Sequence, residues 1–146
     1  MWNALDRYRD SALLVLRLGV GIGFFWYHGW PKLIGGPERW AGVGGAMSSV
    51  GLGFLPMPEV WGFLAAFAES VGALLFAAGL FFRPATFFLA FTMVVATANH
   101  FVTGQGTPAH SLKNFFFFFG LMAVGPGRYS VDHVLAKRRG GGGRKH

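Results

Sequence analysis

The chain contains no cysteine and has few charged side chains. Charged residues make up 13% of its 146 residues, whereas a soluble domain usually carries about 25%. Without cysteine, disulfide bonds, thiolate catalysis and cysteine-ligated iron–sulfur clusters are all excluded. Acidic residues are especially few, with 6 Asp and Glu against 13 Lys and Arg. The composition therefore argues against an ordinary soluble domain.

Apolar and aromatic residues take up most of the remaining sequence. Hydrophobic residues account for 53% of the chain, which includes 17 Phe. A helix needs about 20 mostly apolar residues to cross the hydrocarbon layer of a bilayer. We therefore predict an all-α integral membrane four-helix bundle, in a single domain over residues 1–136. Its spans are expected at about 11–34, 58–82, 84–102 and 111–124.

Glycine and proline residues separate the predicted spans. Between the first two spans, residues 37–57 contain Trp40 among many glycines and serines, so an interfacial or re-entrant segment is expected there. Arg83 and Pro84 leave almost no loop before the third span, which predicts a tight hairpin. Beyond the fourth span a short helix is expected, followed by a basic, glycine-rich, disordered tail over residues 137–146.

Basic residues are concentrated on one side of the predicted spans. That side carries both chain ends and the connection between the second and third spans, with Arg7, Arg9, Arg83, Arg128, Lys137, Arg138, Arg139, Arg144 and Lys145. The other side carries Lys32, Arg39 and Lys113. The positive-inside rule then places both termini in the cytoplasm. The net charge of +7 is interpreted as contact with anionic lipid, and no nucleic-acid partner is expected.

Several polar or ionisable residues lie inside the predicted spans. Such groups are costly within the hydrocarbon layer, and they normally face the protein interior with a partner. They are Arg17, His28, Lys32, Glu69, Asn99, His100, Lys113 and Asn114. Arg17, His28 and Lys32 follow helical spacing and share one face of the first span. Glu69 is flanked by small residues, which allow a neighbouring helix to approach closely.

Helix rise and antiparallel threading predict the depth of these side chains. Glu69 lies near the middle of its span, and Arg17 lies on the cytoplasmic side of the middle. Either Arg17 or Lys32 can therefore be the cation that pairs with Glu69. The groups expected in the half of the membrane away from the cytoplasm, above Glu69, are His28, Lys32, His100, Lys113 and Asn114.

Each of these residues also has a purely structural interpretation. Lys32 and Lys113 can extend to the lipid headgroups, and an Arg17–Glu69 pair can serve only to align two helices. The histidines of the first and third spans can each be satisfied by one hydrogen bond, and their spacing is not diagnostic of a haem or metal site.

Several motifs follow one another along the chain. They are Arg17, GIGFFWYHGWPKLIG, FAESVGALLFAAGLFFRPA, ANHFVTG and GPGRYSVD. In this order they resemble the DoxX family of small bacterial membrane proteins, over about residues 13–132. The resemblance covers Lys32, Trp40, Glu69 and His100, whereas the family's residue near His28 varies. It implies a four-helix membrane bundle in the bacterial cytoplasmic (inner) membrane.

The resemblance also implies a redox function, because the naming members of the family are associated with thiosulfate:quinone oxidoreduction. We therefore expect a quinone-linked oxidoreductase subunit, with no intrinsic cofactor or metal, that binds an isoprenoid quinone and receives electrons from a redox partner subunit. A related branch uses cysteine chemistry, which this chain cannot perform. The expected catalytic residues are Glu69, His100 and Lys32, of which Glu69 relays protons. The expected ligand contacts are His28, Arg17, Trp40, Asn99, Lys113 and Asn114.

The aromatic run Phe115–Phe119 is expected chiefly to face lipid and to pack against other helices. A less favoured alternative is that it walls an apolar pocket for the isoprenoid tail.

Two other classes of function stay open. A non-catalytic accessory or assembly subunit would use Arg17 and Glu69 structurally, and it would form a stable complex without a bound small molecule. A small transporter is also consistent with buried charges. Four short helices make a poor pore, so a transporter would have to act as a homo-oligomer and would show flux in liposomes.

Overall fold

All regular secondary structure in residues 3–141, which the computed structural model describes, is helical. The all-α class predicted from the sequence is therefore confirmed. The elements in chain order are α1 (Asn3–Asp6), α2 (Arg9–Phe24), the π-helical turn η1 (Phe25–Gly29), α3 (Trp30–Leu33), α4 (Gly36–Gly44), the 3-10 segment η2 (Gly45–Val50), α5 (Pro58–Phe67), the π-helical turn η3 (Ala68–Gly72), α6 (Ala73–Ala78), α7 (Phe82–Thr103), α8 (Pro108–Val124) and α9 (Val131–Gly141).

Three continuous helices are long and apolar enough to cross a membrane, judged by length and composition. The first runs over Arg9–Leu33 through η1, the second over Pro58–Ala78 through η3, and the third is α7, Phe82–Thr103. Helix α8 has 17 residues and packs along α7. It begins at Pro108, three residues before the predicted start of the fourth span, because Thr107 caps its N-terminus by accepting a hydrogen bond from the Ala109 amide at 3.4 Å.

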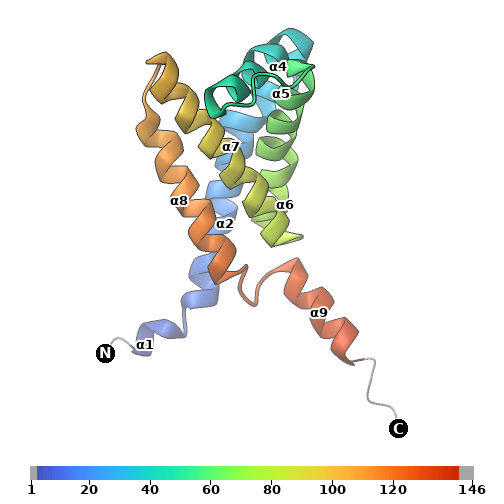
Figure 1. Cartoon of the computed structure of the whole chain (residues 1–146). Helices are drawn as coiled ribbons and strands as arrows, with labels where there is room; N and C mark the ends of the chain where they lie inside the picture. The colour runs from blue at the N-terminus through green and yellow to red at the C-terminus, as the bar shows by residue number, and fades with distance from the viewer. Residues whose placement is uncertain (1–2, 142–146) are drawn as a thin grey trace.

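The long helices run alongside one another, as Figure 1 shows for α2, α5–α6, α7 and α8. Helix α2 packs against α6, and α7 packs against both α8 and α6. The segment α4–η2 and the α7–α8 connection lie at one end of the molecule, here called the α4 end. Helices α1 and α9 lie at the opposite end, here called the α9 end.

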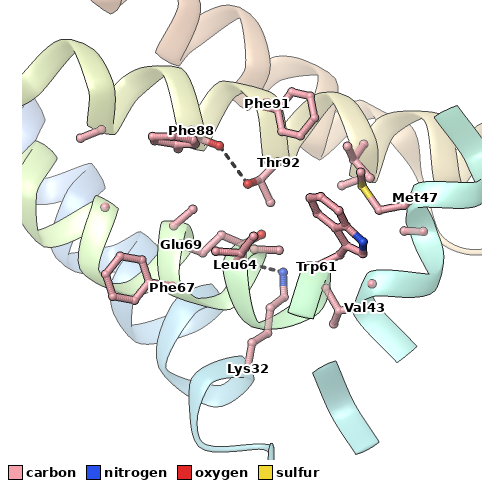
Figure 2. A pocket seen from close by; sticks show the side chains of 18 of the residues that line it. Lys32, Val43, Met47, Trp61, Leu64, Phe67, Glu69, Phe88, Phe91 and Thr92 are labelled. Atoms are coloured by element: carbon pink, nitrogen blue, oxygen red, sulfur yellow. Dashed lines mark hydrogen bonds and ion pairs between the residues drawn. The ribbon is translucent and has the colours of Figure 1, made fainter. Parts of the chain in front are cut away.

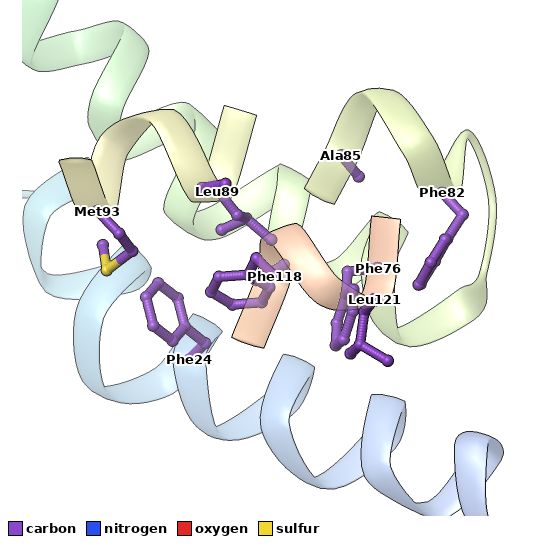
Figure 3. Packing of buried hydrophobic residues seen from close by; sticks show 10 residues of the cluster. Phe24, Phe76, Phe82, Ala85, Leu89, Met93, Phe118 and Leu121 are labelled. Atoms are coloured by element: carbon purple, nitrogen blue, oxygen red, sulfur yellow. The ribbon is translucent and has the colours of Figure 1, made fainter. Parts of the chain in front are cut away.

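Aromatic side chains form the centre of the packing (Figure 3). Phe76 of α6 and Phe118 of α8 are almost completely buried, with ring centroids 5.4 Å apart in an edge-to-face arrangement. Phe24 of α2 meets Phe118 edge-on at 5.3 Å, and Leu89 of α7 is fully buried beside them. Edge-to-face contacts of this kind stabilise a pair of rings by about 0.5–1.5 kcal/mol beyond the area that they bury. This cluster therefore joins four of the long elements.

The segment between the first two long helices is largely helical and packs against α5 and α7. Helices α4 and α5 approach closely because glycine occupies both sides of their contact. A Cβ atom on Gly44 would overlap the carbonyl group of Pro58, and one on Gly62 would overlap that of Trp40. The sequence predicted an interfacial or re-entrant segment here. In the structure this segment contains the helical elements α4 and η2, which pack over one end of α5.

Polar contacts hold the α9 end together. The Asp132 carboxylate accepts hydrogen bonds from the backbone amides of Phe81 and Phe82, each at 2.9 Å, and so caps the first turn of α7. Arg128 donates to Asp10 from its backbone amide at 2.9 Å and from Nε at 2.8 Å. The segment that follows α8 therefore ties the start of α2 to the hairpin between α6 and α7. That hairpin is short, as predicted, with Gly79 and Phe81 in the left-handed conformation.

Helix α9 extends farther than the sequence suggested. A short helix was expected up to residue 137, with disorder beyond it, whereas α9 runs to Gly141. The rest of the predicted tail, residues 142–146, lies outside the described residues.

Candidate functional site

A buried ion pair joins the first two long helices. Lys32 Nζ lies 2.5 Å from Glu69 Oε2. Glu69 is fully buried, and the side chain of Lys32 is 26% exposed. The sequence left two cations open as the partner of Glu69, and the structure selects Lys32. The second carboxylate oxygen of Glu69, Oε1, is buried without a hydrogen-bond partner among the described residues.

Two π-helical turns face each other at this pair. Turn η1 comes directly before the short helix that carries Lys32, turn η3 contains Glu69, and the two turns pack together. A Cβ atom on Gly29 would overlap the backbone of Glu69 and Ser70, so only glycine permits this approach. Single π-turns inside α-helices are frequent at functional sites. Here they bring an acid and a base from neighbouring helices into direct contact.

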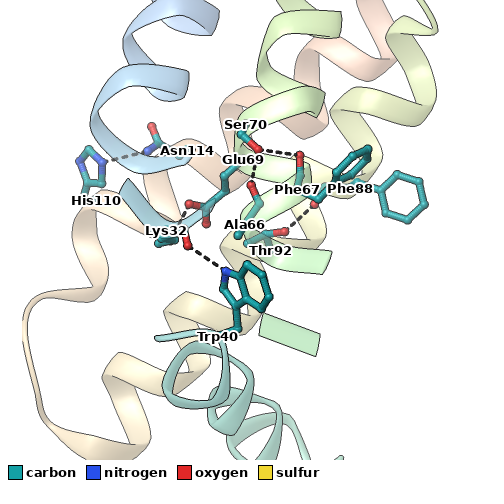
Figure 4. A network of polar contacts seen from close by, with 10 residues as sticks. All are labelled: Lys32, Trp40, Ala66, Phe67, Glu69, Ser70, Phe88, Thr92, His110 and Asn114. Atoms are coloured by element: carbon teal, nitrogen blue, oxygen red, sulfur yellow. Dashed lines mark hydrogen bonds and ion pairs between the residues drawn. The ribbon is translucent and has the colours of Figure 1, made fainter. Parts of the chain in front are cut away.

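Trp40 of α4 holds the backbone near Lys32 rather than its ammonium group. The indole Nε1 donates a hydrogen bond to the Lys32 carbonyl oxygen at 2.9 Å (Figure 4). The indole ring also meets Phe63 of α5 at a centroid distance of 5.1 Å. Trp40 therefore positions Lys32 from the α4 side.

A large apolar cavity lies on one side of the ion pair. It has a volume of about 480 Å³ and lies between α5–α6 and α7, with η2 at one end (Figure 2). Its walls are mainly aliphatic and aromatic, including Met47, Trp61, Leu64, Phe67, Phe88 and Phe91. Lys32 and Glu69 are the charged residues in its wall. This volume falls within the range of about 300–1,000 Å³ that is usual for small-molecule sites.

A smaller cavity lies on the other side of the same pair. It has a volume of about 140 Å³ and is lined by Phe24, His28, Lys32, Glu69, Met93, Ala96, His100, His110 and Ser111. His28 and His110 approach each other with ring centroids 5.2 Å apart. His100 Nδ1 donates to the Gln105 carbonyl oxygen at 2.6 Å, so one of its ring nitrogens is already engaged.

Several predicted site residues thus meet at this place. His28, Lys32, Glu69 and His100 line the small cavity together, and Trp40 contacts the backbone of Lys32.

Arg17 lies elsewhere, and its expected ligand contact therefore has no support in the geometry. It is only 1% exposed, and its guanidinium donates to the Tyr129 carbonyl oxygen at 2.6 Å near the α9 end. Its atoms also lie against Gly79, where a Cβ atom would overlap Arg17 Nη1. Arg17 therefore contacts the segment after α8 and lines neither cavity.

Three further predicted ligand contacts also lie away from both cavities. Asn99 accepts a hydrogen bond from Ser49 Oγ at 3.1 Å and so links α7 to η2. Asn114 donates to His110 Nε2 at 3.1 Å. Lys113 is exposed on α8. Of these three residues, Asn114 alone is linked to the small cavity, through its hydrogen bond to His110.

His110 was not among the site residues predicted from the sequence. This residue precedes the predicted fourth span, whereas in the structure it lies in the first turn of α8. Proline at position 108 after a capping threonine is a helix-start signal. If Thr107 and Pro108 had been taken as the start of the helix, the predicted fourth span would have included His110.

The phenylalanine run of α8 lines neither cavity. Phe118 belongs to the buried core, Phe115 and Phe117 pack against it, and Phe116 and Phe119 are exposed. The favoured expectation, packing and outward-facing surface, agrees with this arrangement. The alternative, a wall for an isoprenoid tail, gains no support from the cavities, because the apolar cavity lies between α5–α6 and α7.

Within residues 3–141, no group of three or more His, Cys, Asp or Glu side chains is arranged to hold a metal ion. The three histidines of the small cavity are thus neighbours without forming a ligand set.

The fold and the site define an α-helical membrane protein with an ion pair buried between two cavities. A family model described as DoxX matches residues 12–104, which is more than half of the chain. The protein belongs to the DoxX family, and its apolar helices contact the lipid bilayer. No curated protein and no solved structure matches the chain.

Proposed function

We propose that this protein is the quinone-binding membrane subunit of a redox system. The observation that carries the proposal is the Lys32–Glu69 pair in the wall of an apolar cavity of about 480 Å³. An isoprenoid quinone combines an apolar tail with a headgroup whose carbonyl oxygens accept hydrogen bonds. A cavity with apolar walls and one polar place fits that combination.

The residues present fit such a ligand in two respects. Lys32 is a cationic donor at the cavity wall, and a side chain that is 26% exposed can move toward a headgroup carbonyl. Oε1 of Glu69 is buried without a partner among residues 3–141, and a buried polar atom normally has one. A hydroxyl group of a reduced headgroup, or a water molecule, would satisfy it. The tail would then lie along the aromatic walls formed by α5 and α7.

When bound, the quinone supplies a two-electron, two-proton couple. Glu69 is proposed to hold or release a proton at its carboxylate, and Lys32 to compensate its charge. Trp40 keeps Lys32 in place through its backbone. The electrons are assigned to a redox partner subunit.

The topology proposed with this function has four membrane spans and both termini in the cytoplasm of a bacterium. Under this topology α8 is the fourth span, and the α9 end, with its basic residues, lies on the cytoplasmic side. Fusions of a periplasm-active reporter after Gly104 and after Arg128 test the arrangement. Activity only in the Gly104 fusion is expected, and the reverse pattern would overturn the orientation.

Mass spectrometry of co-purified small molecules tests the proposed ligand. We expect a stoichiometric isoprenoid quinone with the native chain and loss of most of it in Glu69→Gln. Glu59→Gln is the matched control, because Glu59 is an exposed acid in the first turn of α5. Quinone in all three proteins at equal amounts would remove Glu69 from the site. Bulk phospholipid alone in every sample would overturn the proposal.

Finding only bulk phospholipid in every sample would favour an accessory or assembly subunit. One feature is consistent with that role: α9 points away from the long helices (Figure 1) and carries the basic residues Arg138 and Arg139 in its last turn. Its residues Val131, Val134 and Leu135 are exposed. A stable complex with a larger protein, lost when α9 is deleted, would support this alternative.

A further inference from the structure

Glu69 separates two cavities of different chemistry. Lys32, Glu69 and Ala96 are the residues that line both of them. The larger cavity is apolar apart from the ion pair and Thr92. The smaller one adds three histidines and Ser111 to the same pair. One carboxylate thus borders an apolar cavity and a second cavity in which histidines lie among apolar side chains.

The small cavity has the size and lining of a water site. A water molecule takes up roughly 30 Å³ in the liquid, and a buried water needs two to four polar partners. A volume of about 140 Å³ therefore holds a few water molecules. His28 and His110 supply hydrogen-bonding atoms around it, together with Lys32 and Glu69. The Ser111 hydroxyl already donates to the Pro108 carbonyl oxygen at 3.1 Å and accepts from Thr97 Oγ1 at 2.9 Å. The larger cavity offers far fewer such partners along its aromatic walls.

The small cavity also reaches the surface of the protein. His110 is exposed in the first turn of α8, His28 is half-buried, and Glu69 is fully buried. The imidazole rings of His28 and His110 are direct neighbours, with ring centroids 5.2 Å apart. Histidine changes its charge more readily near neutral pH than other side chains, and it commonly serves as a proton shuttle.

We propose that the small cavity is a water-filled path that carries protons between the α4 end of the molecule and Glu69. His110 and His28 relay the proton, and the apolar cavity beyond the ion pair excludes water. In each transfer one proton leaves a hydronium ion or an imidazolium and binds the Glu69 carboxylate, so that the donor becomes water or neutral imidazole and no oxidation state changes. The titratable groups facing this path are Lys32 from α3, His28 from η1, His100 from α7 and His110 from α8.

The use made of these protons rests on the proposed quinone function, whereas the path itself does not. Under the proposed topology, the path would open away from the cytoplasm. Both experiments below use the protein without added quinone. Failure to find a quinone would therefore overturn the proposed function and leave the path standing, and the converse also holds.

Cysteine accessibility tests whether the small cavity contains water. The native chain has no cysteine, so a single introduced thiol is the sole target of a thiol reagent. Ser111→Cys places the thiol in the small cavity, and Ala68→Cys places it in the apolar cavity. Ser70→Cys is the matched control, because Ser70 is fully buried and lines neither cavity.

A charged, water-soluble methanethiosulfonate should modify Ser111→Cys at least about tenfold faster than the other two variants, since the reagent needs a hydrated thiolate. An apolar maleimide should modify Ala68→Cys in preference to Ser70→Cys. Equal, slow reaction of the charged reagent with all three thiols would overturn the proposal, as would its fast reaction with Ala68→Cys.

Infrared spectroscopy after a pH jump tests whether His28 relays the proton. The band of the Glu69 carboxyl is identified as the one missing in Glu69→Gln. After the pH jump, this band should change on the order of 100-fold more slowly in His28→Phe, because one positioned proton-transfer group usually contributes a factor of that size. His133→Phe is the control, because His133 lies on α9, far along the chain from the cavity. An unchanged rate in folded His28→Phe would overturn the relay.

Discussion

Removing Lys32 while leaving Glu69 tests the buried ion pair most directly. In Lys32→Met the side chain keeps a similar length and loses its charge, so the carboxylate 2.5 Å away loses its partner. Breaking a buried pair by removing one member costs about 3–5 kcal/mol. Because the Lys32 side chain is 26% exposed, water can replace it in part. We therefore expect a loss near the lower end, about 3 kcal/mol in the free energy of unfolding.

The opposite substitution should cost less. Glu69→Leu leaves the Lys32 ammonium group, which can reach water. The free energy of unfolding should therefore fall by only about 1 kcal/mol, the upper value for an exposed ion pair. The double variant Lys32→Met/Glu69→Leu removes both charges together. Replacing a buried pair by apolar residues is often neutral, so the double variant should be more stable than Lys32→Met alone.

The assay is reversible unfolding in mixed micelles with rising denaturing detergent, followed by circular dichroism. Lys113→Met is the control, since Lys113 is exposed on α8, and surface changes usually fall within about 0.5 kcal/mol. A loss below about 1 kcal/mol in Lys32→Met would equal that of an exposed pair. That result would refute the conclusion that Lys32 compensates a charge at Glu69.

Three further substitutions test the packing around the site, with the same unfolding assay. Gly29→Val should destabilise strongly, by about 3 kcal/mol or more, because its Cβ would overlap the Glu69 backbone, whereas Gly23→Val, with open space around it, should cost far less. Asp132→Ala should cost about 1–2 kcal/mol through loss of the cap on α7; an effect below about 0.3 kcal/mol would show that water satisfies those amides equally well. Phe118→Ala should cost about 3–5 kcal/mol, and Phe116→Ala, at a position that is 62% exposed, should be nearly neutral; similar losses would contradict the assigned core.

The apolar segments could be predicted from the sequence because they depend on composition and length alone. The first three predicted spans overlap helices Arg9–Leu33, Pro58–Ala78 and Phe82–Thr103. The burial of Glu69 was also foreseeable, since an acid in the middle of an apolar helix, flanked by small residues, has few other places to go. Ala66 and Ala73, on either side of it, are fully buried as that spacing requires.

Other parts of the site could not be predicted from helical spacing. A helical period shows which side chains share a face, but it does not show which of two cations on that face meets an acid on another helix. The period placed Arg17 and Lys32 on one face and left both as partners of Glu69. The chain segment after α8 decides between them, because the Tyr129 carbonyl accepts a hydrogen bond from Arg17. That contact joins residues 112 positions apart, which no local pattern reports.

The sequence by itself determined that this chain is helical, belongs in a membrane and buries an acid. These properties follow from hydrophobicity and local spacing, which are summed along the chain. Only the tertiary structure decided which cation neutralises Glu69, and only it placed that pair between a cavity of about 480 Å³ and one of about 140 Å³. A cavity is the space that several helices leave between them. Its shape therefore depends on how α2, α5–α6, α7 and α8 pack against one another, and no single segment encodes it.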